Sequence, residues 1–223
     1  LYPMCTLSGF ESVDYGLPVK LVRDEANVRV VASFIGQDTR YVRVECRLES
    51  DLVNKAGEVF GEPRVHHTAT VLLLKAGAEA DTRDAPFAGP PSRSKPSFQP
   101  EFIYKRFFHG PRFQAHGGLV KGVRDGDDFG ADGIALMPAQ LPNSDLFAIE
   151  GDSQPRLEAS PMLVEACFQN AGLVAMEVDG LSSLPVGIEE CQIIRQAGDD
   201  EKLRLRSYRR ENEGDGVTRH DAV

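Results

Sequence analysis

The amino-acid sequence predicts an α+β protein built from two units, and three observations support this prediction. The first third of the chain alternates large apolar and polar residues, as half-solvated antiparallel strands do. Residues 76–100 are rich in Ala, Gly, Ser and Pro, so we place a proline-rich linker at residues 81–100. A long apolar helix at residues 161–178 then stands among further strand-like segments.

The first unit, residues 1–80, is expected to consist mostly of strands. The segments with the alternation or short apolar runs of strands are residues 17–22, 28–34, 41–48 and 64–74. Gly and Asp between the second and third segments suit a tight turn. No long helical pattern is visible before residue 80.

The second unit, residues 101–223, is expected to combine one helix with an antiparallel sheet. An aromatic segment at residues 102–113 precedes the predicted strands, which lie at residues 119–123, 133–137, 184–195 and 203–209. His116, beside two glycines, is predicted to lie in a loop.

The helix at residues 161–178 is the most informative part of the chain. Ser160 followed by Pro161 is typical of a helix start. Apolar residues cover nearly its whole circumference, so we expect it to be buried on most sides. Glu165 and Gln169 interrupt this surface four residues apart, and therefore on one face. Because a buried carboxylate is unfavourable unless it is paired or functional, we expect chemistry here.

Composition excludes several classes of function. Hydrophobic residues make up 41% and charged residues 26% of the chain, as in soluble globular proteins. The net charge of −9 argues against a nucleic-acid or anionic-membrane partner. The sequence shows neither a transmembrane run nor a signal-peptide pattern, and its four isolated cysteines predict neither a metal site nor a disulfide. We therefore expect a cytoplasmic protein.

Several segments of the sequence resemble a known family. Residues 107–114, with His109 before Gly110-Pro111 and Phe113, are similar to the signature that opens the second half of polyketide-synthase-type dehydratase domains. Residues 161–169 resemble the helix of that half, which carries an acid followed four residues later by Gln. Residues 184–189 and 64–69 resemble strands of the two halves, so the likeness spans nearly the whole chain. It is nearest to the dehydratase regions of polyketide and polyunsaturated-fatty-acid synthases.

The resemblance implies a double hot dog fold, with two antiparallel sheets wrapping helices and an incomplete first unit. It implies a lyase of polyketide or fatty-acid biosynthesis that removes water from a 3-hydroxyacyl thioester on acyl carrier protein. In that reaction a neutral His takes the α proton and an acid protonates the leaving hydroxyl. Glu165 corresponds to the acid and Gln169 to the residue that orients it, while His109, Gly110, Pro111 and Phe113 would line the substrate site.

The resemblance also implies partners and cofactors. The expected partners are acyl carrier protein and other synthase domains, with a homodimer as a further option and neither nucleic acid nor membrane. No metal or organic cofactor is expected, because elimination next to a thioester needs only a base, an acid and a polarised carbonyl. The phosphopantetheine arm of the carrier protein arrives with the substrate.

One part of the family pattern is missing. Family members carry their base in a His-x-x-x-Gly-x-x-x-x-Pro motif near the start of the first unit, and this sequence has none. Either the missing His lies upstream of Leu1, or the chain is a noncatalytic structural or acyl-binding module of a megasynthase. We favour the first, because Glu165 and Gln169 have little reason to persist on a helix that merely packs. Double-bond isomerisation is a third alternative, since it needs the same two groups.

The candidate residues also have structural interpretations. Glu165 could face solvent or pair with Arg112 or Arg156, and Gln169 could be a solvated amide. His109 could donate a hydrogen bond where family members commonly have Tyr, or simply hold a turn. The adjacent histidines 66–67 face opposite sides of a strand, so at most one could replace the missing base.

Overall fold

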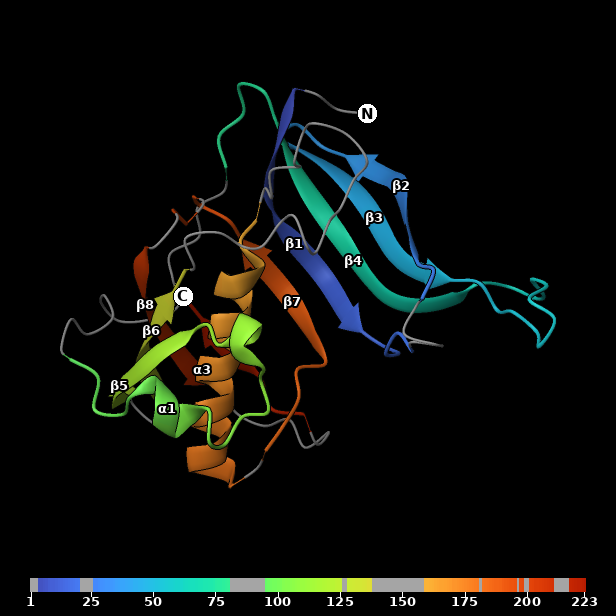
Figure 1. Ribbon diagram of the computed structural model, residues 1–223. Coiled ribbons are helices and arrows are strands. Elements are labelled where there is room, and N and C mark those ends of the chain that lie inside the picture. Colours follow the sequence, from blue (N-terminus) through green and yellow to red (C-terminus); the bar gives the residue numbers. More distant parts are fainter. Residues whose placement is uncertain are drawn as a thin grey trace. The chain divides into compact units, whose positions relative to one another are not determined.

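The computed structural model describes residues 4–20, 26–80, 95–125, 128–137, 159–180, 182–195, 197–198, 201–210 and 217–223. The structure is a mixture of two antiparallel sheets and few helices, so the expected α+β class is confirmed (Figure 1). Two compact units form, one from Leu1–Arg83 with Pro185–Arg195 and the other from Asp84–Leu184 with Gln196–Val223. We call them unit 1 and unit 2. Among the described residues, no helix is long and apolar enough to cross a membrane.

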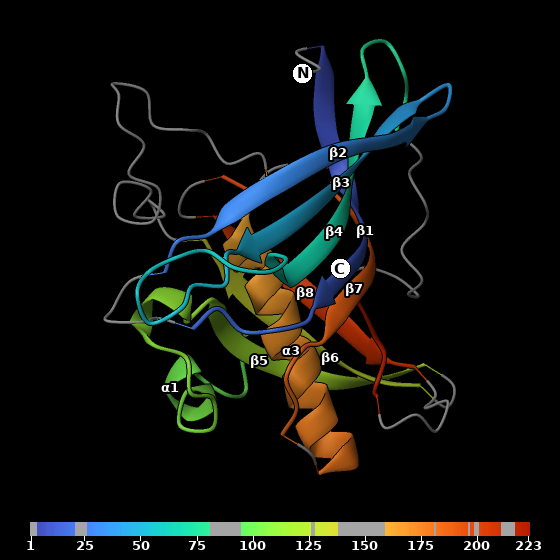
Figure 2. The same cartoon turned by 90° about the vertical axis from the view of Figure 1, so that its right-hand side faces the viewer.

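Unit 1 is a five-stranded sheet in the order β2-β3-β4-β1-β7 (Figure 2). Its strands are β1 (Cys5–Tyr15), β2 (Arg29–Gln37), β3 (Tyr41–Ser50), β4 (Arg64–Lys75) and β7 (Gly187–Gln192). The predictions of β2, β3 and β4 are confirmed. The strand predicted at residues 17–22 is wrong for residues 17–20, which have no strand structure, and residues 21–22 lie outside the described part.

Strand β7 differs from the sequence-based expectation, which assigned it to the second unit. It pairs antiparallel with β1, with Phe10 opposite Cys191 and Val13 opposite Ile188. The pairing gives hydrogen-bond partners to the edge of β1 that β4 does not occupy. A Cβ atom at Gly9 would collide with the carbonyl oxygen of Cys191, so glycine permits this close approach.

Unit 2 is a four-stranded sheet in the order β5-β6-β8-β9, with helix α3 packed on β6 and β8. Its elements are α1 (Pro100–Ile103), β5 (His116–Asp125), β6 (Asp128–Leu136), α3 (Pro161–Asp179), β8 (Lys202–Arg209) and β9 (His220–Ala222). A 3-10 turn at Pro111–Phe113 precedes β5. The apolar core between helix and sheet contains Ala115, Ala135, Met137, Met162, Ala166 and Leu205.

The linker predicted at residues 81–100 lies mostly outside the described residues. Its described end belongs to unit 2, where Ser97 and Phe98 donate backbone hydrogen bonds to the carbonyl of Leu119 in β5. Residues 95–100 are therefore part of the folded unit, and Pro100 already begins α1.

Helix α3 begins and ends as its sequence indicates. The Ser160 side chain accepts a hydrogen bond from the Leu163 amide at 3.3 Å, and Pro161 occupies the first turn. Gly180 ends the helix with φ of 65°, a left-handed conformation that favours glycine. These two signals position Glu165 and Gln169 on the first turns of the helix.

Candidate active site

A carboxyl group and an imidazole meet beside the first turns of α3. Nε2 of His109 lies 2.8 Å from Oε1 of Glu165, and their side chains are 18% and 23% exposed. His109 lies in the segment that connects α1 with the 3-10 turn, so different elements supply the two groups. At this distance the two groups are joined by a hydrogen bond.

Gln169 holds the same carboxyl group from the next turn of α3. Its amide Nε2 donates to Oε1 of Glu165 at 2.8 Å and to the carbonyl oxygen of Phe113 at 2.7 Å. Its Oε1 accepts a hydrogen bond from the Tyr104 hydroxyl at 2.6 Å. Gln169 is only 2% exposed, so this amide is a buried group with its donors used.

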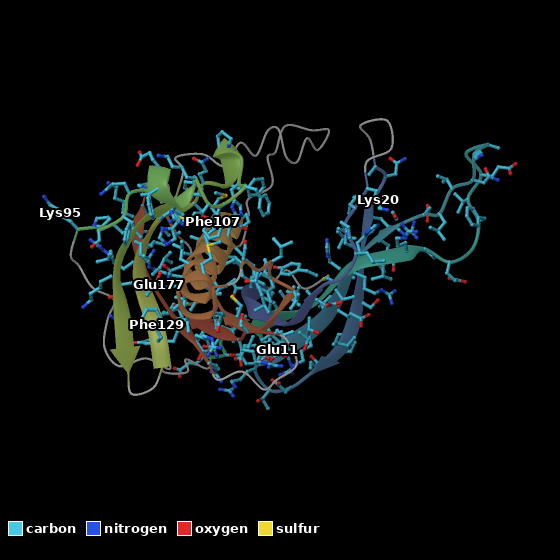
Figure 3. The ribbon with its side chains drawn as sticks, turned by 90° about the horizontal axis from the view of Figure 1, so that it is seen from below. Glu11, Lys20, Lys95, Phe107, Phe129 and Glu177 are labelled. Atoms are coloured by element: carbon cyan, nitrogen blue, oxygen red, sulfur yellow. The ribbon has the colours of Figure 1, made fainter. Side chains whose placement is uncertain are left out.

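Aromatic rings enclose the imidazole of His109. The Phe107 ring meets it edge-on, with 5.5 Å between centroids, and Phe108 stacks on it at 4.9 Å. Phe107 in turn lies over Gly172 of α3, where a Cβ atom would come within 3.4 Å of the ring (Figure 3). Among the described residues, Nδ1 of His109 is buried without a hydrogen-bond partner. Because a buried unpaired N–H is rarer than an unpaired acceptor, the ring proton belongs on Nε2, facing Glu165.

A second polar network docks α3 onto the sheet. The Asn170 amide donates to the Ala131 carbonyl at 3.0 Å and to Oγ of Ser207 at 2.7 Å, while its oxygen faces Nε2 of His116 at 2.9 Å. Gly133 leaves room for this contact, since a Cβ atom there would lie 2.5 Å from Oδ1 of Asn170. Three strands are thereby tied to one helical side chain.

His116 is a structural histidine, and the prediction that it lies in a loop was wrong. It is the first residue of β5, it is fully buried, and its Nδ1 accepts a hydrogen bond from the Gly118 amide at 3.2 Å. Burial lowers the pKa of His116 to about 4, while the hydrogen bond to Asn170 opposes this effect. The imidazole is therefore neutral at ordinary pH and donates from Nε2 to Asn170.

Tyr104 connects the two networks. Its hydroxyl accepts a hydrogen bond from the backbone N–H of His116 at 2.7 Å and donates to Gln169. Burial raises the pKa of Tyr104 to about 12, the nearby charge of Glu165 adds to the rise, and the backbone hydrogen bond from His116 opposes it. The phenol therefore keeps its proton and remains a donor at every pH of interest.

The predicted site residues contribute side chains, a backbone carbonyl or the shape of a turn. Glu165, Gln169 and His109 come together through side chains, and Phe113 contributes its carbonyl oxygen. Gly110 and Pro111 set the turn between His109 and Phe113, because Gly110 caps the 3-10 turn that Pro111 begins. The predicted pairing of Glu165 with Arg112 or Arg156 lies outside the described side chains.

Sequence reasoning missed Tyr104, which bonds Gln169, and it missed Asn170 and Ser207, which dock α3 on the sheet. One signal was present for Asn170, which places a second amide beside Gln169 on an otherwise apolar helix. In unit 1, His66 has both ring nitrogens occupied, by Oγ of Ser50 at 2.8 Å and by the Leu17 carbonyl at 3.0 Å. That histidine serves the sheet of unit 1.

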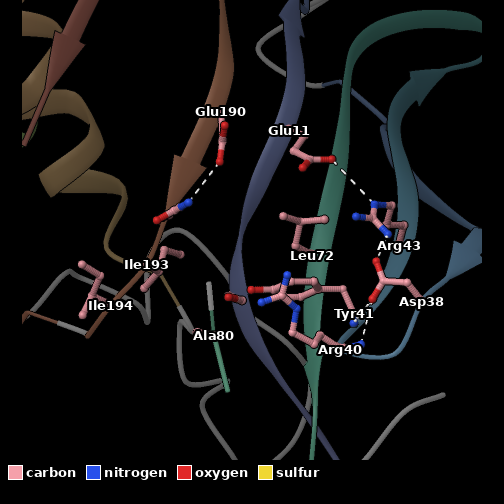
Figure 4. Close-up of a pocket in the computed structure, with 12 residues that line it drawn as sticks. Glu11, Asp38, Arg40, Tyr41, Arg43, Leu72, Ala80, Glu190, Ile193 and Ile194 are labelled. Carbon is pink, nitrogen blue, oxygen red and sulfur yellow. Dashed lines mark hydrogen bonds and ion pairs between the residues drawn. The ribbon is translucent and has the colours of Figure 1, made fainter. Parts of the chain in front are cut away.

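A separate hollow lies on unit 1 (Figure 4). Its charged lining pairs internally, since Arg43 contacts Asp38 at 2.7 Å and Glu11 at 3.9 Å. Asp38 also accepts backbone hydrogen bonds from Arg40 and Tyr41. Because these groups satisfy one another, we place the candidate active site at the partly exposed pair of His109 and Glu165 instead.

In the described part of the chain, no group of three or more His, Cys, Asp or Glu residues lies close enough to hold a metal ion. Comparison with known proteins assigns no family, since neither a protein-family model nor a curated protein matches the chain. The geometry of the site and the resemblance in the sequence are therefore the two guides to function.

Proposed function

We propose that this chain is a dehydratase-type lyase of polyketide or fatty-acid synthesis, which eliminates water from a 3-hydroxyacyl thioester carried by acyl carrier protein. The observation that supports it best is the 2.8 Å contact between Nε2 of His109 and Oε1 of Glu165. An imidazole and a carboxyl group are the base and acid that this elimination needs. The two sheets would then belong to a double hot dog fold, with unit 1 as its incomplete half.

In the proposed reaction the thioester carbonyl makes the hydrogen on the α carbon acidic. His109, with its Nε2–H toward Glu165, takes that proton through the lone pair of Nδ1. Glu165 donates its carboxyl proton to the 3-hydroxyl, the C–O bond breaks, the C=C bond forms, and water leaves. The imidazolium then releases a proton and the carboxylate regains one, so the pair returns to its starting state.

The surroundings of His109 suit this role. Phe107 fixes the ring from one edge, and Phe108, which covers its face, is 80% exposed. Because the Phe108 ring is largely exposed, it can move when an acyl chain approaches the imidazole. Gln169 holds Oε1 of Glu165, so the acid keeps its position as the substrate enters.

His109 could also supply the base that family members carry in the missing His motif. Family members commonly have Tyr at this position, whereas this chain supplies an imidazole within hydrogen-bond distance of the acid. A noncatalytic relic has no need of such a pair, so the pair favours the enzyme over the structural or acyl-binding alternative. The proposed partners are the acyl carrier protein, whose phosphopantetheine arm would carry the substrate, and other synthase domains.

The proposal is tested by incubating the chain with a 3-hydroxyacyl pantetheine thioester and measuring the 2-enoyl product. His109→Asn is expected to lower kcat/KM for dehydration at least about 100-fold, which is typical of the loss of a general base. His67→Asn removes an imidazole from unit 1 and is expected to leave turnover unchanged.

Three results would contradict this assignment. Full activity in His109→Asn would remove its base, and a loss confined to His67→Asn would transfer that role to unit 1. A product whose double bond has moved, formed from an enoyl thioester without loss of water, would favour the isomerase. Binding of the thioester with no turnover would favour the acyl-binding module.

A further inference from the structure

We propose that Tyr104 is a positioning residue that fixes the orientation of the Gln169 amide. The fixed amide bonds Oε1 of Glu165, so Oε2 is the oxygen that exchanges a proton with the substrate. This inference rests on the proposed function for the identity of the reaction. The arrangement of hydrogen bonds that carries it can be measured without any turnover.

The orientation of the Gln169 amide follows from its neighbours. One end of the amide faces two acceptors, the Phe113 carbonyl at 2.7 Å and Oε1 of Glu165 at 2.8 Å. A flipped amide would place its own oxygen against both of them, so this end must be the NH₂ group. The other end is then the carbonyl oxygen, and the Tyr104 hydroxyl is its donor at 2.6 Å.

The same bonds distinguish the two oxygens of Glu165. Oε1 accepts from the Gln169 amide and faces Nε2 of His109, each at 2.8 Å. No described residue bonds Oε2. An oxygen that already faces two N–H groups is a poor place for a further proton, so the proton that the carboxyl group donates resides on Oε2.

Tyr104 is itself held in one orientation. Its oxygen accepts the His116 backbone N–H at 2.7 Å, which leaves its single hydrogen for Gln169. His116 is fixed in turn through its ring by Asn170 of α3. The contact from His116 to Tyr104 is a backbone amide, which does not release protons, so this chain of contacts positions Glu165 and does not relay protons.

The test compares Tyr104→Phe with Ser207→Ala by NMR and by steady-state kinetics. Tyr104→Phe removes the donor to Gln169 and keeps the ring, so the Gln169 side-chain amide protons are expected to exchange faster with solvent and to shift. With the 3-hydroxyacyl pantetheine thioester, kcat is expected to fall about tenfold while KM changes little. Ser207→Ala removes a hydroxyl from the Asn170 network only, and is expected to leave the Gln169 signals and kcat unchanged.

A double variant separates positioning from a general loss of stability. Because Tyr104 acts through Gln169, Tyr104→Phe combined with Gln169→Leu is expected to have the kcat of Gln169→Leu alone. Multiplied effects would overturn the inference, as would unchanged Gln169 signals in Tyr104→Phe. If Tyr104→Phe does not fold, solvent exchange of the Gln169 side-chain amide protons is measured in the native protein. Rapid exchange there would contradict the hydrogen bonds from this amide to Phe113 and Glu165. Altered Gln169 signals in Tyr104→Phe, in a chain that never dehydrates a thioester, would uphold the positioning role and refute only the proposed reaction.

Discussion

Replacing Glu165 with Gln is expected to lower kcat/KM for dehydration by about a thousandfold. The amide of Gln has almost the shape of the carboxyl group and can still accept from Gln169, yet it has no carboxyl proton to give to the leaving hydroxyl. Substrate binding should persist, so the loss should appear mainly in kcat. The measurement is steady-state formation of the 2-enoyl thioester.

The matched control is Glu177→Gln, which makes the same chemical change at an exposed position of α3 (Figure 3). It is expected to retain the full rate, because its carboxyl group lies two turns beyond Gln169 and outside the network around Glu165. Equal rates for Glu165→Gln and the native chain would remove the acid from the mechanism.

Asn170→Leu is expected to destabilise the protein by at least about 3 kcal/mol, which follows from the hydrogen bonds left unmade. The substitution keeps the number of side-chain heavy atoms but removes the hydrogen bonds that Asn170 makes with three buried groups, namely Nε2 of His116, the Ala131 carbonyl and Oγ of Ser207. Each such group costs about 1–3 kcal/mol, and a whole domain is stable by only about 5–15 kcal/mol. Urea denaturation, followed by circular dichroism, measures the loss.

A graded comparison makes that result specific. Ser207→Ala removes one hydroxyl and leaves the other bonds of Asn170 in place, so its expected loss is about 1 kcal/mol. If Asn170→Leu were as stable as the native chain, the polar network would not be what docks α3 on the sheet.

Strands β2, β3 and β4 could be predicted because alternation or an apolar run covers most of each strand, and the register shift in each pairing lies near a strand end. These patterns placed the three strands close to their observed bounds. Strand β1 was missed because its pairing with β4 shifts register between Leu7 and Gly9 and again between Glu11 and Asp14. Each bulge reverses the face on which side chains emerge, so the period of two disappears from the sequence.

Residue spacing predicted the candidate site only along the helix, while His109 and Phe113 were predicted from the family resemblance. The spacing of Glu165 and Gln169 already places them on one face, and the helix start at Ser160 sets their position. Tyr104 and Gln169 are 65 residues apart in the chain, and His116 and Asn170 are 54 residues apart. No local pattern connects such pairs, because the fold of unit 2 alone brings them together.

The most direct test of the account is a double-variant cycle on dehydration with His109→Asn and Glu165→Gln. A base and an acid that act in the same elimination step behave as a unit, so either substitution alone should remove nearly all of the catalysis they provide. We expect the double variant to be no slower than the slower single variant. Losses that multiply, or a native chain that never dehydrates a 3-hydroxyacyl thioester, would contradict an acid–base pair of His109 and Glu165.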